Sequence, residues 1–212
     1  VALLRAVKTL AVEVHEHTLM TELLVKSDER GARRVVGIET MDAAGIRREI
    51  AADIVVLASG GAGQMYSHTT NPTVTTGDGV AAAWRAGAAL PDLEFYQFHP
   101  TSLAVPGNPL VSEAVRGEGA VLLDEGGTRF MLDAHPDGEL APRDVVPRGI
   151  AAAMQRQGGR PVMLDATALG REFLSERFPG ITRVTREHGF DWAEHPIPVT
   201  PAAHYWMGGI ST

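Results

Sequence analysis

Residues 54–63 read IVVLASGGAG, an apolar run that passes directly into a cluster of glycines. The apolar residues follow one another without alternation, as in a strand that is covered on both faces. We therefore predict a strand of a parallel sheet at residues 54–59. The glycines behind it would let the backbone approach the adenosine or pyrophosphate of a dinucleotide. An ordinary turn from strand to loop explains the same residues, so this pattern leaves both interpretations open.

The segment before this run is rich in short apolar stretches separated by polar turns. It contains VEVHEH, LMTELLVK, RRVVGIETM and REIAAD, with turns at 27–31 and 43–45. This pattern predicts strands, and we expect a small antiparallel meander over residues 12–59. Residues 1–8 look helical, so Val1 lies inside an element, and Thr212 comes just after a glycine turn. We therefore expect both ends of the chain to be cut.

The stretch VAAAWRAGAAL, residues 80–90, is rich in alanine and predicts a helix that Gly87 closes near its end. We expect this helix to pack on the parallel sheet. Asp78 lies between two glycines at the start of the helix. Its carboxylate is suited to a ribose or ribitol hydroxyl, and also to the role of helix N-cap.

A second domain is predicted from about residue 91 to residue 200, where short helices alternate with loops rich in glycine and proline. One helix is well marked, because Asp144 is a plausible N-cap and Pro147 falls in the first turn, before the helix ends at Gly158. Arg143 therefore lies just before a helix N-terminus. The prolines in residues 196–201 predict an extended hinge strand that returns to the first domain.

Composition excludes several classes of protein. The 212 residues carry 26 acidic and 19 basic side chains, and no segment concentrates Lys and Arg as a nucleic-acid site requires. The chain has no cysteine, so it has neither disulfides nor thiolate metal sites, which suits a reducing cytoplasm. No apolar run reaches the roughly 18 residues of a membrane span, and no signal peptide is recognisable. We expect a soluble, cytoplasmic protein without nucleic-acid or membrane partners.

The usual motifs of metal and hydrolase sites are also missing. His15 and His17 flank Glu16 on one predicted strand, but no further ligand is near them and no HExxH spacing occurs. We therefore predict no metal. The sequence contains neither a G-x-S-x-G elbow nor a Walker loop.

Two histidines lie at the two edges of the predicted second domain. His99 stands in FHPT and His204 in AAHY. An imidazole near neutrality can donate a hydrogen bond to a carboxylate or exchange a proton. A structural role for either residue remains the alternative.

Two further groups of polar residues could bind a substrate. Residues 112–119, SEAVRGEG, combine a hydroxyl, two carboxylates and an arginine, which suits either a polar substrate or a surface ion network. Arg143 offers a guanidinium fork that matches a carboxylate, close to a helix N-terminus. A surface pair with Asp144 would account for Arg143 equally simply.

Eight segments taken together resemble one family. In chain order they read LASGGAG, TTNPTVTTGDGVAAAWRAGA, LEFYQFHPTSL, SEAVRGEGAVL, GTRFM, ELAPRDVVPRGI, LDAT and PVTPAAHYWMGGI. They are similar to the flavoproteins that comprise L-aspartate oxidase, fumarate reductase and succinate dehydrogenase. The order QFHPT, RGEGA, LAPRDVV, PAAHYWMGG makes the resemblance specific, and it extends over nearly the whole chain. The TTNP, LEF, TRFM and IPVTPAAHY segments are most similar to the L-aspartate oxidase branch.

The resemblance implies a fold of the class α/β plus α+β. Part of a glutathione-reductase-like Rossmann domain would bind FAD non-covalently, and a mixed α+β capping domain would close over the flavin. On this basis we expect residues 1–90 in the FAD-binding domain, 91–200 in the capping domain, and 201–212 in a return into the FAD-binding domain.

The resemblance also implies roles for individual residues. The expected FAD contacts are Ser59, Gly60, Gly61 and Asp78. The expected substrate-binding residues are His99, Ser112, Glu113 and His204. Arg143 would be the proton-transfer residue, and with His99 and His204 it would form the catalytic set. Ser59 and Ser112 stand where the family often has threonine, and both keep the hydroxyl.

The activity implied is oxidation of L-aspartate to iminoaspartate, with electrons passed to oxygen or fumarate, as the first step of de novo NAD synthesis. Quinolinate synthase is the implied partner. The alternatives are a fumarate reductase or succinate dehydrogenase flavoprotein subunit, and an independent binding domain without flavin. The family's G-x-G-x-x-G loop and a further carboxylate-binding arginine are not in this chain. We therefore expect weak FAD binding and no turnover from the chain alone.

Overall fold

The computed structural model describes residues 2–10 and 12–211, so Val1 and Thr212 lie outside the described residues. Contacts between Cα atoms divide the chain into two compact units. The first comprises the described parts of Val1–Gly60, Asp78–Leu90 and Ile210–Thr212, and the second comprises Gly61–Gly77 and Pro91–Gly209. Residues 61–77 and 201–209 thus group with the predicted second domain. The division into an FAD-binding and a capping domain stays a prediction.

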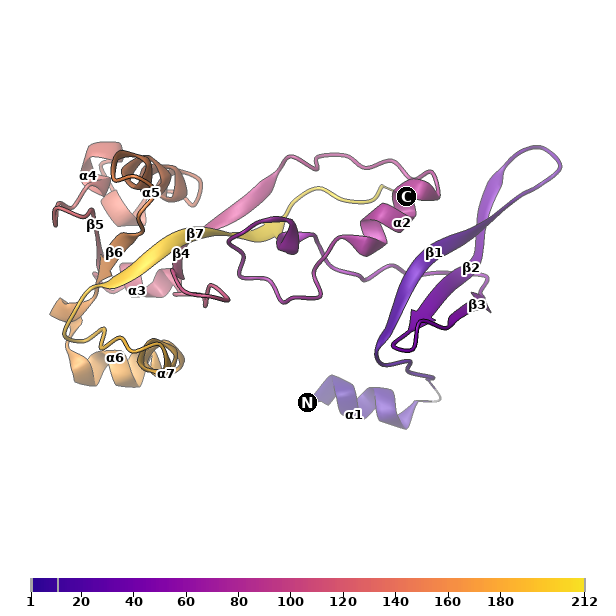
Figure 1. Cartoon of the computed structure of the whole chain (residues 1–212), viewed down its shortest axis with the longest axis horizontal. Helices are drawn as coiled ribbons and strands as arrows, with labels where there is room; N and C mark the ends of the chain where they lie inside the picture. Colours follow the sequence, from indigo (N-terminus) through magenta and orange to yellow (C-terminus); the bar gives the residue numbers. More distant parts are fainter. Residues whose placement is uncertain (1, 11, 212) are drawn as a thin grey trace. The chain divides into compact units, whose positions relative to one another are not determined.

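The first unit is built on an antiparallel sheet of three strands (Figure 1). Its elements are α1 (Ala2–Thr9), β1 (Thr18–Ser27), β2 (Arg33–Asp42), β3 (Arg47–Ala51) and α2 (Asp78–Arg85). The strands pair in the order β1-β2-β3, which confirms the predicted meander. Residues 12–17, predicted as a strand, do not form one.

Aspartates make both turns of this sheet. Asp28 accepts hydrogen bonds from the backbone N–H groups of Arg30 and Ala32, and Asp42 accepts from those of Ala44 and Ile46. Such side-chain bonds satisfy backbone groups that a turn leaves unpaired, so each aspartate favours a reversal at its own position. The turns therefore fall where the polar residues predicted them.

The predicted parallel strand at residues 54–59 is wrong for the described chain. These residues have no regular secondary structure, and the side chains of Ile54 and Val56 are each 83% exposed. A strand exists only where a neighbouring strand takes up its hydrogen bonds. Residues 54–59 pair with no strand of either described sheet, and both sheets are antiparallel. Apolar character by itself could not supply that neighbour.

Helix α2 ends close to Gly87, as its sequence predicts. It begins at Asp78, two residues before the predicted alanine-rich stretch, and ends at Arg85. Gly87 adopts a φ of 94°, a conformation that ends helices and strongly favours glycine. Asp78 is the first helical residue and lies at the surface.

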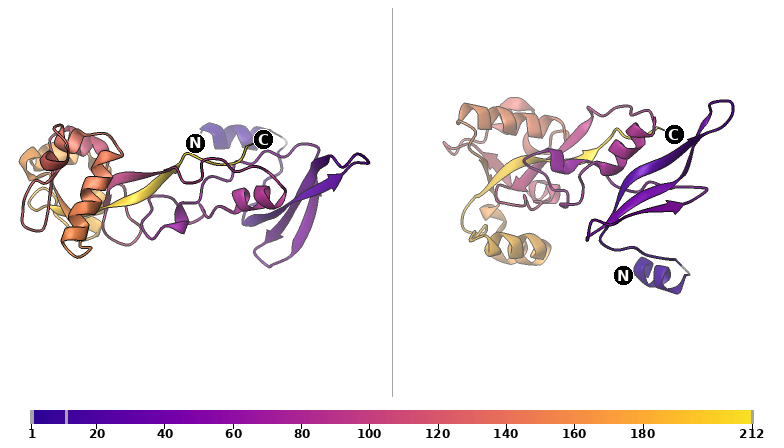
Figure 2. Two further views of the ribbon diagram at one scale, coloured as in Figure 1. Left: turned by 90° about the horizontal axis from the view of Figure 1, so that it is seen from above. Right: turned by 45° about the vertical axis from the view of Figure 1, so that its right-hand side comes forward.

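The second unit contains a four-stranded antiparallel sheet in the order β4-β7-β6-β5. The strands are β4 (Tyr96–Leu103), β5 (Val121–Leu123), β6 (Val162–Asp165) and β7 (Ile197–Trp206). The helices are α3 (Glu113–Gly117), α4 (Met131–Ala134), α5 (Val145–Arg156), α6 (Arg171–Arg177) and α7 (Pro179–Glu187), with short 3-10 turns at Gly63–Met65, Gly138–Leu140 and Thr167–Leu169. Helices α4 and α5 lie together, and α6 and α7 form a second pair (Figures 1 and 2).

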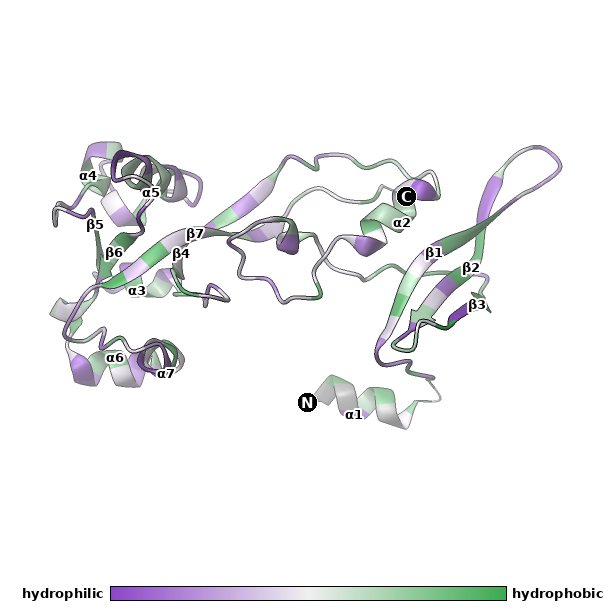
Figure 3. Cartoon of the chain, in the orientation of Figure 1, coloured by the Kyte–Doolittle hydropathy of each residue, from purple (hydrophilic) through white to green (hydrophobic). Residues whose placement is uncertain are grey.

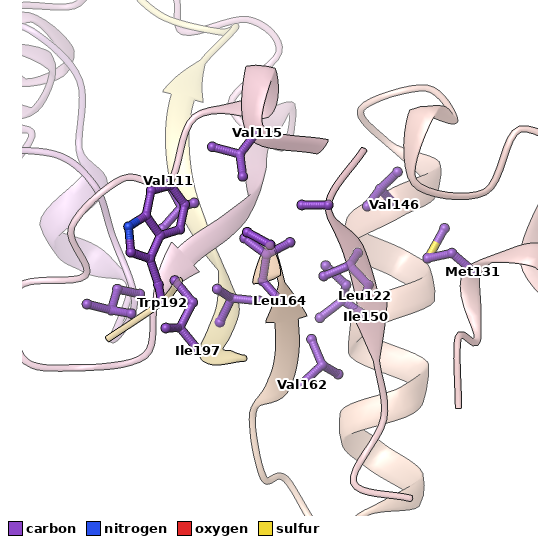
Figure 4. Close-up of a cluster of buried hydrophobic side chains, with 14 of the residues drawn as sticks. Val111, Val115, Leu122, Met131, Val146, Ile150, Val162, Leu164, Trp192 and Ile197 are labelled. Carbon is purple, nitrogen blue, oxygen red and sulfur yellow. The ribbon is translucent and has the colours of Figure 1, made fainter. Parts of the chain in front are cut away.

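One hydrophobic core holds this unit together. Leu122, Ile150, Leu164, Trp192 and Ile197 converge in it from three strands, α5 and the loop after α7 (Figure 4). Hydrophobic residues are correspondingly concentrated on β6 and the first part of β7 (Figure 3). Burying a large apolar side chain contributes roughly 1.5–3 kcal/mol, so this core fixes the strands that carry the polar residues discussed below.

Two predicted details of this unit are corrected. Asp144 occupies the N-cap position of α5 but makes no side-chain cap bond, because its carboxylate pairs with Arg148 at 3.3 Å. The proline-rich segment 196–201 is extended as predicted, but it continues into β7 and lies inside the sheet. It is therefore a structural strand of the second unit.

Candidate active site

Strands β4 and β7 bring the two candidate histidines together. The imidazole centroids of His99 and His204 are 5.2 Å apart, with the rings at 70° to each other. Gln97 pairs with Tyr205 and the next residue, Phe98, pairs with Ala203, so His204 is an extra residue in β7. Such a β-bulge redirects a side chain. The bulge thus accounts for the meeting of two histidines on adjacent strands.

His99 is the more buried of the two, with 2% of its surface exposed. The pKa of His99 is lowered to about 4, mainly by burial and then by the neighbouring His204, Arg116 and Arg143, against a hydrogen bond with the Thr101 backbone that raises it. Nδ1 of His99 lies 3.0 Å from the Thr101 carbonyl oxygen and 3.2 Å from the Thr101 amide nitrogen. His99 is therefore neutral at neutral pH.

His204 is also neutral at neutral pH. Partial burial, followed by the charge of Arg143, lowers its pKa. A neutral imidazole carries one N–H donor and one acceptor. Each ring can therefore offer one N–H hydrogen bond to an anion. A positive charge that attracts the anion must come from other residues.

Arginines supply that charge on either side of Glu113. Nε of Arg143 donates to Oε2 of Glu113 at 2.7 Å, and Nη2 of Arg116 lies 3.8 Å from Oε1. Arg143 also donates from Nη1 to Oε1 of Gln97 at 3.3 Å. Burial raises the pKa of Glu113, but the hydrogen bond and charge of Arg143, with the charge of Arg116, outweigh it and the pKa is lowered. Glu113 is thus ionised between two cations.

Ser112 has a structural role in this arrangement. It is the N-cap of α3, and its Oγ accepts a hydrogen bond from the backbone N–H of Ala114 at 3.3 Å. This bond fixes the start of the short helix that carries Glu113 and Arg116 on one face. The predicted contact of Ser112 with a substrate stays a prediction.

Arg116 is a residue that the sequence did not single out. It is buried, and its Nε and Nη2 atoms have no hydrogen-bond partner among the described residues. Burial lowers its pKa, against the charge of Glu113, which raises it. Buried N–H groups without a hydrogen bond are costly, so these two nitrogens are available to an anion. Its signal in the sequence was the spacing of three from Glu113 in the segment SEAVR, at the start of the RGEGA motif.

The main chain of Glu139 holds Arg116, and its buried side chain is fixed by a second arginine. Arg116 donates from Nη1 to the main-chain carbonyl oxygen of Glu139. The carboxylate of Glu139 accepts bidentate hydrogen bonds from Arg129, from Nε at 3.0 Å and from Nη2 at 2.7 Å. Glu139 also accepts from the backbone N–H of Leu122 at 3.0 Å. The GTRFM and ELAPRD motifs therefore meet in one ion pair.

A pocket of about 840 Å³ opens beside this cluster, entirely within the second unit. Arg143 and Gln97 lie in its wall, and the rest is largely apolar, including Phe95, Pro147 and Met207. The two histidines do not line it. Of the predicted catalytic residues, only Arg143 borders this space.

The predicted FAD contacts are divided between the two units. Ser59 and Asp78 belong to the first unit, where a Cβ on Gly79 would collide with the Ser59 side chain, so these two segments touch only because residue 79 is glycine. Gly60 has a φ of 73° and is exposed. Gly61 groups with the second unit, and its carbonyl accepts from the Gly77 amide at 3.1 Å. Exposed glycine backbone next to a hydroxyl and a carboxylate fits the polar part of FAD.

The described residues contain no cluster of three or more potential metal ligands. Nor does any helix within residues 2–10 and 12–211 have the length and apolar character needed to cross a membrane.

Comparison with known proteins gives the family. A model described as "FAD binding domain" matches residues 1–212. The chain belongs to the FAD-binding domain family. FAD is therefore the cofactor of its family.

Named members of the FAD-binding domain family are similar to this chain. L-aspartate oxidase from Nostoc sp. is 57% identical over 169 residues, which are 77% of this chain and 29% of the relative. L-aspartate oxidase from Streptomyces coelicolor is 48% identical over 219 residues, covering 100% of this chain and 37% of the relative. The chain thus spans about a third of the length of these curated relatives.

A solved structure of the family shares the fold. The chain superimposes on a structure titled "Quinol-Fumarate Reductase with Menaquinol Molecules" with a TM-score of 0.79 and 36% identity, over 92% of this chain and 36% of the other. The fold is accordingly that of the fumarate reductase flavoproteins, a combination of β-sheets and helices.

Proposed function

We propose that the protein carrying this chain is an L-aspartate oxidase, which oxidises L-aspartate to iminoaspartate as the first step of de novo NAD synthesis. The observation that carries the proposal is the joint position of two neutral histidines and a Glu113 carboxylate held between two arginines. Donors of this kind suit a substrate with two carboxylates. The names of the similar relatives supply the choice of L-aspartate.

The chain's own residues would bind and orient the substrate. His99 and His204 would donate their N–H groups to carboxylate oxygens, and Arg143 with Arg116 would balance the negative charge. A substrate with one carboxylate would leave some of these donors unpaired, which costs binding energy. Ser112 and Glu113 would complete the substrate-binding set.

Arg143 would act through its charge during amine oxidation. A guanidinium stays protonated at neutral pH, so it is a poor base. When fumarate is the molecule reduced, to succinate, Arg143 would instead be suited to donate a proton to a substrate carbon, with its hydrogen bond to Glu113 holding it in place. FAD, when bound, supplies the capacity to accept a hydride.

The remaining assignments follow the same resemblance. Ser59, Gly60, Gly61 and Asp78 would contact FAD, held non-covalently in a glutathione-reductase-like Rossmann domain that residues 1–90 and 201–212 help to build, with 91–200 as the capping domain. Oxygen or fumarate would accept the electrons. A cytoplasmic location and quinolinate synthase as a partner complete the proposal.

A fumarate reductase or succinate dehydrogenase flavoprotein subunit is the second candidate. The similarity in fold to quinol-fumarate reductase, at 36% identity, favours it. The same pair of histidines and arginines would bind succinate or fumarate, so geometry at the site does not separate the two.

The test is anaerobic reduction of the bound flavin in the full-length protein, followed by its absorbance. We expect bleaching with L-aspartate and much slower bleaching with succinate, and none with L-alanine, which has a single carboxylate. Bleaching by succinate alone would replace the first proposal with the second. The absence of bound flavin in the purified protein would overturn both.

Arg143 gives a second, independent test. Substitution Arg143→Gln should lower the rate of flavin reduction by L-aspartate by about 10²–10³-fold, the range for loss of one positioned electrostatic donor. Its pair with Glu113 is partly exposed, so the melting temperature should change little. Arg183→Gln, which removes an exposed arginine 3.9 Å from Glu187, is the matched control and should leave the rate unchanged. Equal rates in both variants would remove Arg143 from the site.

A further inference from the structure

Residues 69–71 lie against the bulge of β7 and bond to it four times. The backbone N–H of Thr70 donates to the Ala203 carbonyl at 3.0 Å, and Oγ1 of Thr69 donates to the same oxygen at 3.1 Å. Nδ2 of Asn71 donates to the carbonyl oxygen of His204 at 2.8 Å. Oγ1 of Thr70 lies 2.6 Å from Nδ1 of His204. The bulge residue is thus held both by its main chain and by its ring.

Asn71 is itself fixed from several sides. Its backbone N–H donates to Oγ1 of Thr69 at 3.1 Å, and its Oδ1 accepts from the hydroxyl of Tyr96 at 3.2 Å. Nε2 of Gln64 donates to its carbonyl oxygen at 2.9 Å. A Cβ on Gly63 would collide with Asn71, so the chain approaches closely here. The segment is consequently well placed to hold a neighbour in one position.

The direction of the Thr70 hydroxyl proton follows from its surroundings. Within residues 2–10 and 12–211, the only other acceptor within reach of this hydroxyl is the Ala203 carbonyl, at 3.4 Å. That oxygen has two lone pairs and already accepts from Thr70 N–H and Thr69 Oγ1 at shorter distances. With that carbonyl already occupied, the hydroxyl would donate to Nδ1 of His204, and the proton of the neutral ring would then reside on Nε2.

We propose that Thr70 is a positioning residue that holds His204 as the Nε2–H tautomer, with that N–H available to a carboxylate oxygen of the substrate. The inference rests on the proposed function only for the nature of the substrate. The opposite tautomer would place a lone pair on Nε2, which repels a carboxylate. Thr70 therefore acts on binding through His204 and touches no reacting atom.

The kinetic test compares three variants of the full-length, FAD-loaded protein. Thr70→Val keeps the shape and removes the donor, and we expect the KM for L-aspartate to rise about tenfold with a much smaller change in kcat. Thr70→Ser keeps the hydroxyl and should return KM to within about twofold of the original, since a serine hydroxyl donates equally well. Thr73→Val, on the same loop and exposed, is the matched control and should change neither constant.

The spectroscopic test does not depend on the substrate. In ¹⁵N-histidine-labelled protein, the two ring nitrogens of His204 have different shifts according to which one is protonated, and His204→Gln identifies the signal. We expect protonation at Nε2 in the original protein and a mixture of tautomers in Thr70→Val. Protonation at Nδ1 in the original protein would overturn the inference, as would unchanged KM and unchanged shifts in Thr70→Val. If the expected shifts occur without turnover of L-aspartate, the inference stands and the proposed function fails.

Discussion

At the scale of single residues, His99 is a neutral imidazole in a protein interior. Its ordinary pKa of 6.5 is lowered to about 4, with burial as the main cause. In the unfolded chain the ring binds a proton below pH 6.5, whereas in the folded protein it does so only below about pH 4. Folding is therefore opposed by proton uptake between these two values.

This difference predicts the acid sensitivity of the protein. The free energy of unfolding should be independent of His99 above about pH 7 and should fall by roughly 3 kcal/mol through this residue between pH 6.5 and 4. His99→Gln should flatten that part of the profile, measured by urea unfolding at a series of pH values. His188→Gln, an exposed histidine at the end of α7, should keep the original slope. The same slope in both variants would contradict the lowered pKa of His99.

Sequence motifs predicted the site residues unevenly. His99 and His204 were identifiable from HPT and AAHY, and Arg143 from its place before a helix. Arg116 was visible only as one member of a charged cluster, because nothing in a sequence tells a buried arginine from an exposed one. Thr70 could not be found, since its contact with His204 joins residues 134 positions apart.

At the scale of secondary-structure elements, local signals were reliable where the element is locally determined. The meander turns at Asp28 and Asp42 carry their own hydrogen-bond acceptors, and α5 begins next to Asp144 as predicted. The run 54–59 failed because a strand depends on a partner elsewhere. The bulge in β7 was also unpredictable, because it is defined by its register against β4.

The contact between α2 and Ser59 leads to a prediction on FAD. Gly79→Ala places a methyl group against the Ser59 side chain and should separate the two proposed cofactor-contacting segments. We expect FAD affinity, measured by titration of the flavin-free protein, to fall at least about tenfold, equivalent to about 1.4 kcal/mol.

Gly180→Ala is the control for that substitution. Gly180 lies in α7 with no atom within 4 Å of the added Cβ, so alanine fits there and should favour the helix slightly. Its FAD affinity should match that of the original protein. Equal affinity in the Gly79→Ala variant would place the FAD contacts elsewhere.

At the scale of the whole molecule, buried apolar side chains are unevenly shared between the two units. The core cluster of Leu103, Leu164, Val199 and their neighbours lies in the second unit. Buried hydrophobic residues described in the first unit are confined to α2, at Val80, Ala82 and Ala83. The sheet β1–β3 thus depends mainly on its own hydrogen bonds and on half-buried side chains.

Hydrogen exchange should reflect this difference. In the 212-residue chain we expect the amides of β6 and of the first half of β7 to exchange much more slowly than those of β1–β3, because opening a buried core costs more free energy. Exchange monitored by mass spectrometry on peptides from each strand measures this. The substitution Leu164→Ala in the core should accelerate exchange in β6 while leaving β1–β3 unaffected. Equal protection in all strands would show that the units unfold together.

Because His204 is the bulge residue of β7, a change of one residue in the length of this strand would add or remove the second histidine of the site. Because Tyr205 and Ala203 face consecutive residues of β4, removal of the residue between them would remove this register shift and leave only the second one, between His99 and Ser102. The histidine is thus an insertion in one of the two irregular places of this pair of strands. A chain of this architecture can keep its sheet and its core while a single codon decides whether it has the second imidazole.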